Sequence, residues 1–239
     1  AAGRDEAVAS EVLLRMYLLL GAEEVLKYCQ EKLEADPDSL APHFALFNMY
    51  KISGDYDKAL IHVDKCIELS PQGSPGQTNF RVKRAEILTF AYQISSDKQY
   101  LTAAVAEYES LLQKQPNNHS VLNNLAYMLA DSGERLPAAL AYAQRAAQLK
   151  PNDPSVSDTH GYVLHKNGKD AEAAEKLAFA VQQYEQGGAV APPEVYEHLG
   201  MVRESLGAKV EALAAYREAL DTGRQTLSEA AKERLTKAI

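Results

Sequence analysis

The side chains that could do chemistry are scattered along this chain. No two histidines stand four residues apart, the spacing at which one helix face directs two imidazoles at a metal ion. The glycines of residues 161–169 lack the spacing of a phosphate-binding loop, and residues 73–76 lack the G-x-S-x-G order of a nucleophile elbow. The sequence therefore predicts no catalytic residue, no metal site and no cofactor. The histidines considered are His43, His62, His119, His160, His165 and His198.

A recurring spacing organises the chain instead. Between Pro37 and Pro71 lies a segment of about 34 residues that returns in degraded form. Each copy places one small residue where a second helix would press against a first helix. These small residues are Ala59, Ala104, Ala139, Ala173 and Ala212, and their first-helix counterparts are Ala126, Gly161 and Gly200.

Glycines and prolines mark the helix ends within each copy. Glycine favours the left-handed backbone that stops a helix, and proline is tolerated just beyond a helix end because its missing N–H costs nothing there. The expected breaks between paired helices are Gly54, Gly133, Gly168 and Gly207, and the expected terminating prolines are Pro37, Pro71, Pro116 and Pro151.

The period and residue types resemble the tetratricopeptide repeat, whose helical hairpins carry large apolar, small, aromatic, glycine and proline residues at matching offsets. The resemblance implies an all-α fold, a right-handed α-solenoid of about six hairpins with a C-terminal capping helix. We expect a single superhelix over residues 1–239, with hairpins at about 6–36, 39–70, 78–115, 119–150, 154–185 and 193–223 and a cap at 226–238.

Two stretches interrupt the period. Residues 71–77, PQGSPGQ, hold too many glycines and prolines for a helix and are expected to form a loop. Residues 186–193, QGGAVAPP, separate the fifth hairpin from the sixth, with Pro193 suited to a first helical position. Each stretch is read either as a tolerated insertion or as a contact loop.

Composition limits the classes of partner. The formal net charge is −8, which opposes binding to nucleic acid and mildly favours a basic or neutral protein or peptide. Residues 12–20 form the longest apolar run, too short to cross a bilayer, so we expect no direct membrane insertion. Cys29 and Cys66 fall on successive second helices and are interpreted as free core thiols in preference to a disulfide.

The resemblance also implies where a ligand would bind. In tetratricopeptide arrays the first helices line a concave groove, at fixed offsets from the small residues. Amides there can bond an extended backbone, tyrosines offer rigid contact area, and carboxylates favour a basic ligand. The candidate groove residues are Phe44, Asn48, Lys51, Asn123, Asn124, Tyr127, Asp158, Tyr162, His165, Glu197, Met201 and Glu204.

The sequence thus predicts a non-enzymatic scaffold that binds a protein or peptide. The alternative is a structural spacer or self-assembly module that joins copies through its ends or convex face. A clamp for a C-terminal carboxylate is disfavoured, because Phe44 stands where that type of groove has a lysine. The fourth to sixth hairpins resemble bacterial proteins of envelope assembly and export. Compartment, cytoplasmic or exported with its signal removed, and oligomeric state stay open.

Overall fold

The computed structural model describes residues 21–224, 227 and 229–238. In this part of the chain it contains twelve α-helices and no strand, which confirms the all-α fold. The chain divides into two compact units at Lys114 and Gln115, here called the N-terminal and C-terminal units. The single superhelix stays a prediction, and each unit is described by itself.

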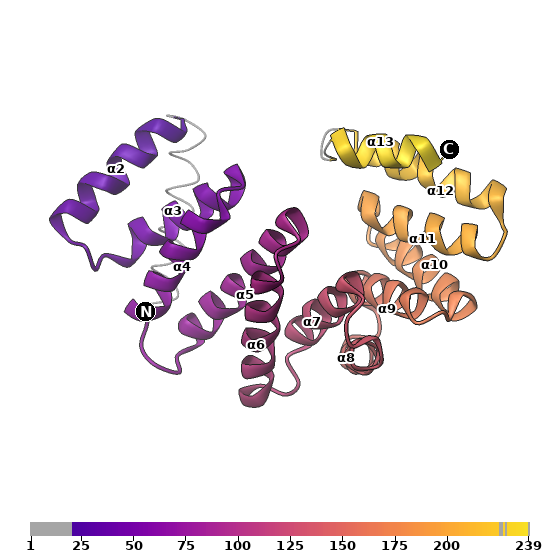
Figure 1. Cartoon of the computed structure of the whole chain (residues 1–239), viewed down its shortest axis with the longest axis horizontal. Coiled ribbons are helices and arrows are strands. Elements are labelled where there is room, and N and C mark those ends of the chain that lie inside the picture. Colours follow the sequence, from indigo (N-terminus) through magenta and orange to yellow (C-terminus); the bar gives the residue numbers. More distant parts are fainter. Residues whose placement is uncertain (1–20, 225–226, 228, 239) are drawn as a thin grey trace. The chain divides into compact units, whose positions relative to one another are not determined.

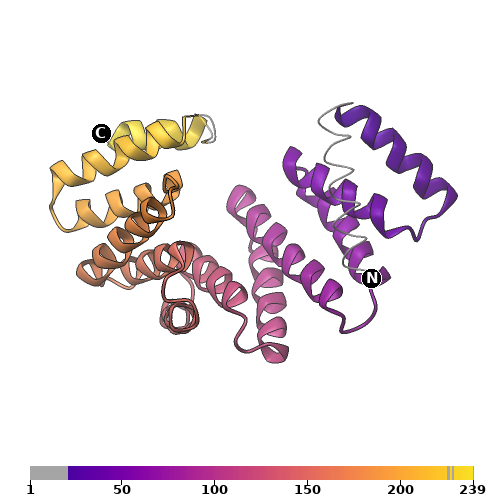
Figure 2. The ribbon, with the colours of Figure 1, turned by 180° about the vertical axis from the view of Figure 1, so that it is seen from behind.

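Apart from the first and the last described helix, the helices pair as antiparallel hairpins. Figure 1 shows these pairs along the colour sequence, and Figure 2 shows the same pairing from behind. The N-terminal unit contains α2 (Ala22–Ala35), α3 (Leu40–Ser53), α4 (Tyr56–Leu69), α5 (Pro75–Ser95) and α6 (Lys98–Lys114). The C-terminal unit contains α7 (His119–Ser132), α8 (Leu136–Leu149), α9 (Pro154–Lys166), α10 (Asp170–Gln186), α11 (Pro193–Ser205), α12 (Lys209–Thr222) and α13 (Glu229–Ala238).

Local residue chemistry explains the turns within the hairpins. Gly54 ends α3 in the left-handed backbone conformation, with φ of 76°. Residues other than glycine adopt this conformation only with strain. Asp55 follows at once and caps α4, because its carboxylate accepts a hydrogen bond from the backbone N–H of Lys58. Gly133 ends α7 in the same way, with φ of 70°.

Small residues allow the paired helices to pack closely. All five second-helix alanines expected to do so are buried, as the period predicts: Ala59, Ala104, Ala139, Ala173 and Ala212. Their first-helix counterparts are equally tight. A Cβ atom added to Gly161 would lie 2.6 Å from Cγ of Leu177, so glycine is what lets α9 approach α10.

The C-terminal helix covers the last hairpin. Leu235 of α13 is buried in one cluster with Tyr196, Tyr216 and Ala219, which lie on α11 and α12. The expected capping helix is therefore present.

Several expectations meet the structure differently. The first helix of the first predicted hairpin, residues 6–20, lies outside the described residues.

The expected loop at 71–77 is shorter, because α5 already begins at Pro75. Proline suits the first turn of a helix, and the Ser74 hydroxyl accepts a hydrogen bond from the N–H of Gln77, so this stretch starts a helix. Cys29 and Cys66 form no disulfide and are both buried, as expected. None of the described helices has the combined length and hydropathy of a bilayer span.

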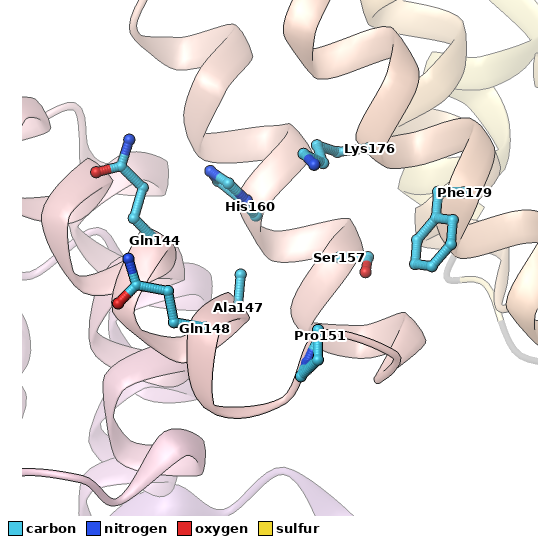
Figure 3. Close-up of a pocket in the computed structure, with 8 residues that line it drawn as sticks. All are labelled: Gln144, Ala147, Gln148, Pro151, Ser157, His160, Lys176 and Phe179. Atoms are coloured by element: carbon cyan, nitrogen blue, oxygen red, sulfur yellow. The ribbon is translucent and has the colours of Figure 1, made fainter.

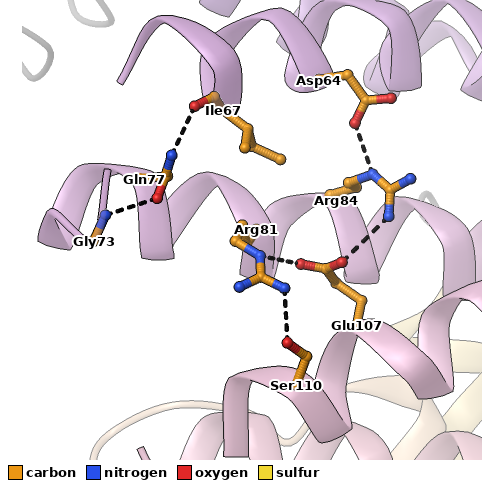
Figure 4. A network of polar contacts seen from close by, with 8 residues as sticks. All are labelled: Asp64, Ile67, Gly73, Gln77, Arg81, Arg84, Glu107 and Ser110. Atoms are coloured by element: carbon orange, nitrogen blue, oxygen red, sulfur yellow. Dashed lines mark hydrogen bonds and ion pairs between the residues drawn. The ribbon is translucent and has the colours of Figure 1, made fainter. Parts of the chain in front are cut away.

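A polar network ties three helices of the N-terminal unit together (Figure 4). Glu107 of α6 accepts hydrogen bonds from Arg81 at 2.5 Å and Arg84 at 3.4 Å, both on α5. Arg84 also donates to Asp64 of α4 at 2.7 Å, and Arg81 donates to the hydroxyl of Ser110 at 3.1 Å. Only 13% of the Glu107 side chain is exposed, against 53% for Asp64. Glu107 is thus the enclosed centre of the network.

Replacement of Glu107 by glutamine is expected to lower the free energy of unfolding by about 2 kcal/mol, since two arginines would lose their enclosed counter-charge. The matched control is Asp64→Asn, which removes an exposed carboxylate from the same network and should cost less than about 1 kcal/mol. Urea denaturation followed by circular dichroism measures both. Equal losses would contradict the central role of Glu107.

Candidate protein-binding face

The first helices of the C-terminal unit stack against one another in the order α7, α9, α11. Each presents a residue directly after its small residue: Tyr127 follows Ala126, Tyr162 follows Gly161, and Met201 follows Gly200. Because side chains at one offset of a repeated helix project on one side, these residues are expected to share a face.

Three aromatic rings meet on this face, one from each first helix. The ring centroids of Tyr127 and Tyr162 are 5.4 Å apart. The imidazole of His198 stacks on Tyr162 at 4.2 Å, with 22° between the planes, and lies 6.2 Å from Tyr127. Tyr162 and His198 are buried, while Tyr127 is half-buried. We call these three residues the ring cluster.

Carboxylates surround the ring cluster. The hydroxyl of Tyr162 donates to Asp131 at 3.2 Å, and Nδ1 of His198 donates to Asp158 at 2.8 Å. Burial and then the charges of Asp131 and Asp158 raise the pKa of Tyr127 above its usual value. The carboxylates of Asp131 and Asp158 thus place negative charge beside the rings.

The charge of the buried His198 side chain opposes this negative charge. Burial alone lowers the pKa of His198, but the charge and hydrogen bond of Asp158, with Glu197 and Glu194 nearby, raise it above the ordinary value. The charged imidazolium is therefore favoured, and it offsets part of the negative potential around the rings.

Two amides extend the face along α7. Asn123 is buried, and its side-chain oxygen accepts no hydrogen bond from the described residues. Asn124 is half-buried. An amide oxygen without a donor can accept a hydrogen bond from a peptide N–H.

The other predicted residues of the C-terminal unit are placed less uniformly. Glu197 and Met201 are half-buried on α11, and Met201 packs against the core beneath α13. Glu204 is exposed and accepts a hydrogen bond from the hydroxyl of Tyr216 at 2.8 Å. Nδ1 of His165 lies 2.6 Å from Oδ1 of Asp170 across the α9–α10 turn, so this histidine ties its own hairpin together.

The predicted residues of the N-terminal unit lie on α3. The Phe44 ring packs edge-on against Phe80 at 5.6 Å, and the Asn48 amide donates to the carbonyl of Phe44 at 2.8 Å. The ammonium of Lys51 lies 6.0 Å from the centre of the Phe90 ring. Phe44 thus packs against the core of this unit, and Asn48 bonds within its own helix.

Two residues of the face were missed as candidates from sequence. His198 precedes Gly200 by two residues, the offset that Asn124 has before Ala126, so the repeat alignment itself carried that signal. Asp131 follows Tyr127 by four residues, the spacing that places two side chains on one helix face. The described residues contain no group of three or more side chains placed to hold a metal ion.

Comparisons with known proteins agree with the repeat architecture. Residues 100–154 match the model of the tetratricopeptide repeat, and no curated protein matches the sequence. The fold is similar to that of PilW, described as a widely conserved type IV pilus biogenesis factor, with 12% identity, coverage of 97% of this chain and 98% of that chain, and a TM-score of 0.69. MamA from Desulfovibrio magneticus RS-1 is similar over 78% of this chain and 98% of its own, with 18% identity and a TM-score of 0.59.

The family model confirms a tetratricopeptide repeat at residues 100–154, and the similar structures confirm the fold. The chain has the helical-hairpin fold of tetratricopeptide proteins, a class of scaffolds that generally mediate interactions between proteins and typically lack enzymatic activity.

Proposed function

We propose that this chain is a non-enzymatic scaffold that binds an extended, basic or neutral segment of a partner protein along α7, α9 and α11. The observation that carries the proposal is the ring cluster with its surrounding carboxylates. Tyr127 supplies partly exposed aromatic area, and Asp131, Asp158 and Glu197 supply the negative potential that attracts a lysine or arginine side chain.

The residues of this face are proposed to have two roles, which depend on how deeply each is buried. Tyr127, Asn124 and Glu197 retain accessible surface and are proposed to touch the ligand. Tyr162 and His198 are buried, so they hold Tyr127 and Asp158 in position beneath the contact surface. A rigid aromatic held in this way loses little conformational entropy when a partner binds.

Replacement of Tyr127 by alanine is expected to weaken partner binding by at least about tenfold, because it removes the accessible ring. Affinity capture from the source cell, followed by mass spectrometry, identifies the partner, and isothermal titration calorimetry then measures its affinity. Tyr142→Ala is the matched control, since Tyr142 is half-buried on the second helix α8.

Unchanged affinity in the Tyr127 variant, or equal loss in both variants, would contradict the proposed contact. The affinity of a basic ligand should also fall as salt concentration rises. An affinity independent of salt would count against the charge preference.

Self-association of the chain is the competing function. Sedimentation across a concentration series separates the two functions, because a scaffold for another protein needs no association between its own copies. Concentration-dependent association that Tyr127→Ala leaves intact would favour the self-assembly module.

We also propose that the partner belongs to a bacterial envelope or export assembly. The support is the resemblance of the last three hairpins to proteins of such assemblies, and PilW, whose fold is similar, is itself described as a pilus biogenesis factor. Recovery of partners from an unrelated process in the affinity capture would contradict this part of the proposal.

A further inference from the structure

A recess lies among α8, α9 and α10 and shares no residue with the ring cluster. It has a volume of about 460 Å³, within the range of sites that bind ligands. Figure 3 shows Gln144 and Gln148 of α8 on one side and Lys176 and Phe179 of α10 on the other. His160 and Ser157 of α9 lie between them. We call this site the α8–α10 recess.

The recess contains a buried polar atom without a partner. Nε2 of His160 makes no hydrogen bond with any described residue. Burial and then the nearby charge of Lys176 lower the pKa of this histidine, so its imidazole is held in the neutral form. A neutral imidazole that carries its proton on Nε2 can donate one hydrogen bond into the recess. In this tautomer Nε2 is a buried donor without an acceptor, which is costly, and the group that it lacks is an acceptor.

The charge of the recess is opposite to that of the chain. Lys176 is the charged residue among those that line it, and none of the lining residues is acidic, although the chain carries a net charge of −8. Glu172 of α10 acts on His160 in the opposite sense to Lys176 and raises its pKa, but its carboxylate is paired with the ammonium of Lys169 at 3.2 Å. The recess therefore favours a negative group over a positive one.

The positive character continues across α8. This helix contains Arg145 and no acidic residue. A neighbouring recess of about 550 Å³ shares Gln144 and Gln148 with the first and adds Arg145, whose guanidinium donates to Asn117 at 2.8 Å. Two cations thus flank a pair of glutamine amides, which can bond the N–H and C=O groups of an extended backbone.

We propose that the α8–α10 recess binds an acidic segment of a partner protein, with a carboxylate held between the ammonium of Lys176 and Nε2 of His160. A carboxylate has two oxygens, one for each donor, and its charge complements the lysine. Gln144 and Gln148 bond the backbone of the segment, and Arg145 attracts a second acid further along it. This site selects the charge opposite to that proposed for the ring cluster, so the two proposals stand or fall separately.

The test uses the full chain and a fluorescein-labelled, amidated peptide in which glutamate and alanine alternate. A peptide with glutamine in place of each glutamate is the control ligand. Fluorescence anisotropy is expected to show binding of the glutamate peptide and at least about tenfold weaker binding of the glutamine peptide. Equal affinity for the two peptides would overturn the proposal.

Two variants with the same change in net charge locate the site. Lys176→Glu is expected to weaken binding of the glutamate peptide by at least about tenfold, and Lys209→Glu, on the exposed start of α12, by less than about threefold. Both lysines are exposed, so neither change disturbs the core. Equal weakening would mean that only overall charge matters and would overturn the site.

His160→Phe tests the buried donor, since the ring is retained and the nitrogen is lost. We expect weaker binding of the glutamate peptide with unchanged binding of a partner at the ring cluster.

Competition by free glutarate as strong as that by the unlabelled peptide would show a site for small carboxylates and would contradict the protein partner.

Discussion

Replacement of Phe80 by alanine is expected to lower the free energy of unfolding by about 3–5 kcal/mol, one of the largest effects of any single change in this chain. Phe80 lies on α5 with only 1% of its surface exposed. It packs in one cluster with Phe47 of α3 and Val63 of α4, so its loss leaves a cavity between two hairpins. Urea denaturation followed by circular dichroism measures the change.

The matched control is Phe90→Ala in the same helix. Phe90 is 41% exposed, so the same truncation should cost less than about 1 kcal/mol. A comparable loss in both variants would indicate that helix propensity, and not burial of Phe80, determines the effect.

Replacement of Gly200 by valine is expected to lower the free energy of unfolding by about 2–3 kcal/mol through overpacking. A Cβ atom at this position would lie 2.4 Å from Cε1 and 2.6 Å from Cδ1 of the Tyr216 ring. That ring is buried, and its hydroxyl is bonded to Glu204, so it has little freedom to move aside. The small gain in helix propensity over glycine offsets only a few tenths of a kcal/mol.

A double-mutant cycle identifies the steric cause. The cost of Gly200→Val should fall clearly in a Tyr216→Ala background, because the ring that the new side chain strikes is then absent. Strictly additive costs would place the strain elsewhere.

The fold was predictable because its determinants are local and repeated. Several hairpins share one small residue at the helix contact, one glycine at the turn and one proline after the second helix. Ala139, Gly133 and Pro151 fill these positions within one copy and can be recognised from the next. Where two local signals compete, as at Pro75, the sequence alone gave the wrong boundary, since proline both breaks and begins helices.

The candidate face was predictable only in part. Repeat offsets place Tyr127 and Tyr162 on one side of α7 and α9, but they do not say which ring lies beneath the other. That depends on His198, which stacks on Tyr162 and buries it. The imidazole comes from a third helix, and His198 follows Tyr162 by 36 residues, about one repeat period. Only the packed structure shows the contact between them.

The α8–α10 recess had no sequence signal of its own. Lys176 and Gln144 stand on different helices at no motif spacing. His160 occupies a position where the other copies have leucine, Leu125 and Leu199. That substitution was visible in the alignment of copies, yet the open space beside it arises from the separation of α8 and α10, which residue types do not fix.

The ring cluster draws one residue from each of α7, α9 and α11, and this has a consequence during protein synthesis. Until the ribosome has passed His198, Tyr162 has no stacking partner and the carboxylate of Asp158 has no imidazole. A nascent or prematurely ended chain would display the tyrosines without their supported arrangement. Under the proposed function, partner capture would thus begin only once α11 is in place, and a bound partner would in turn oppose the separation of α7, α9 and α11.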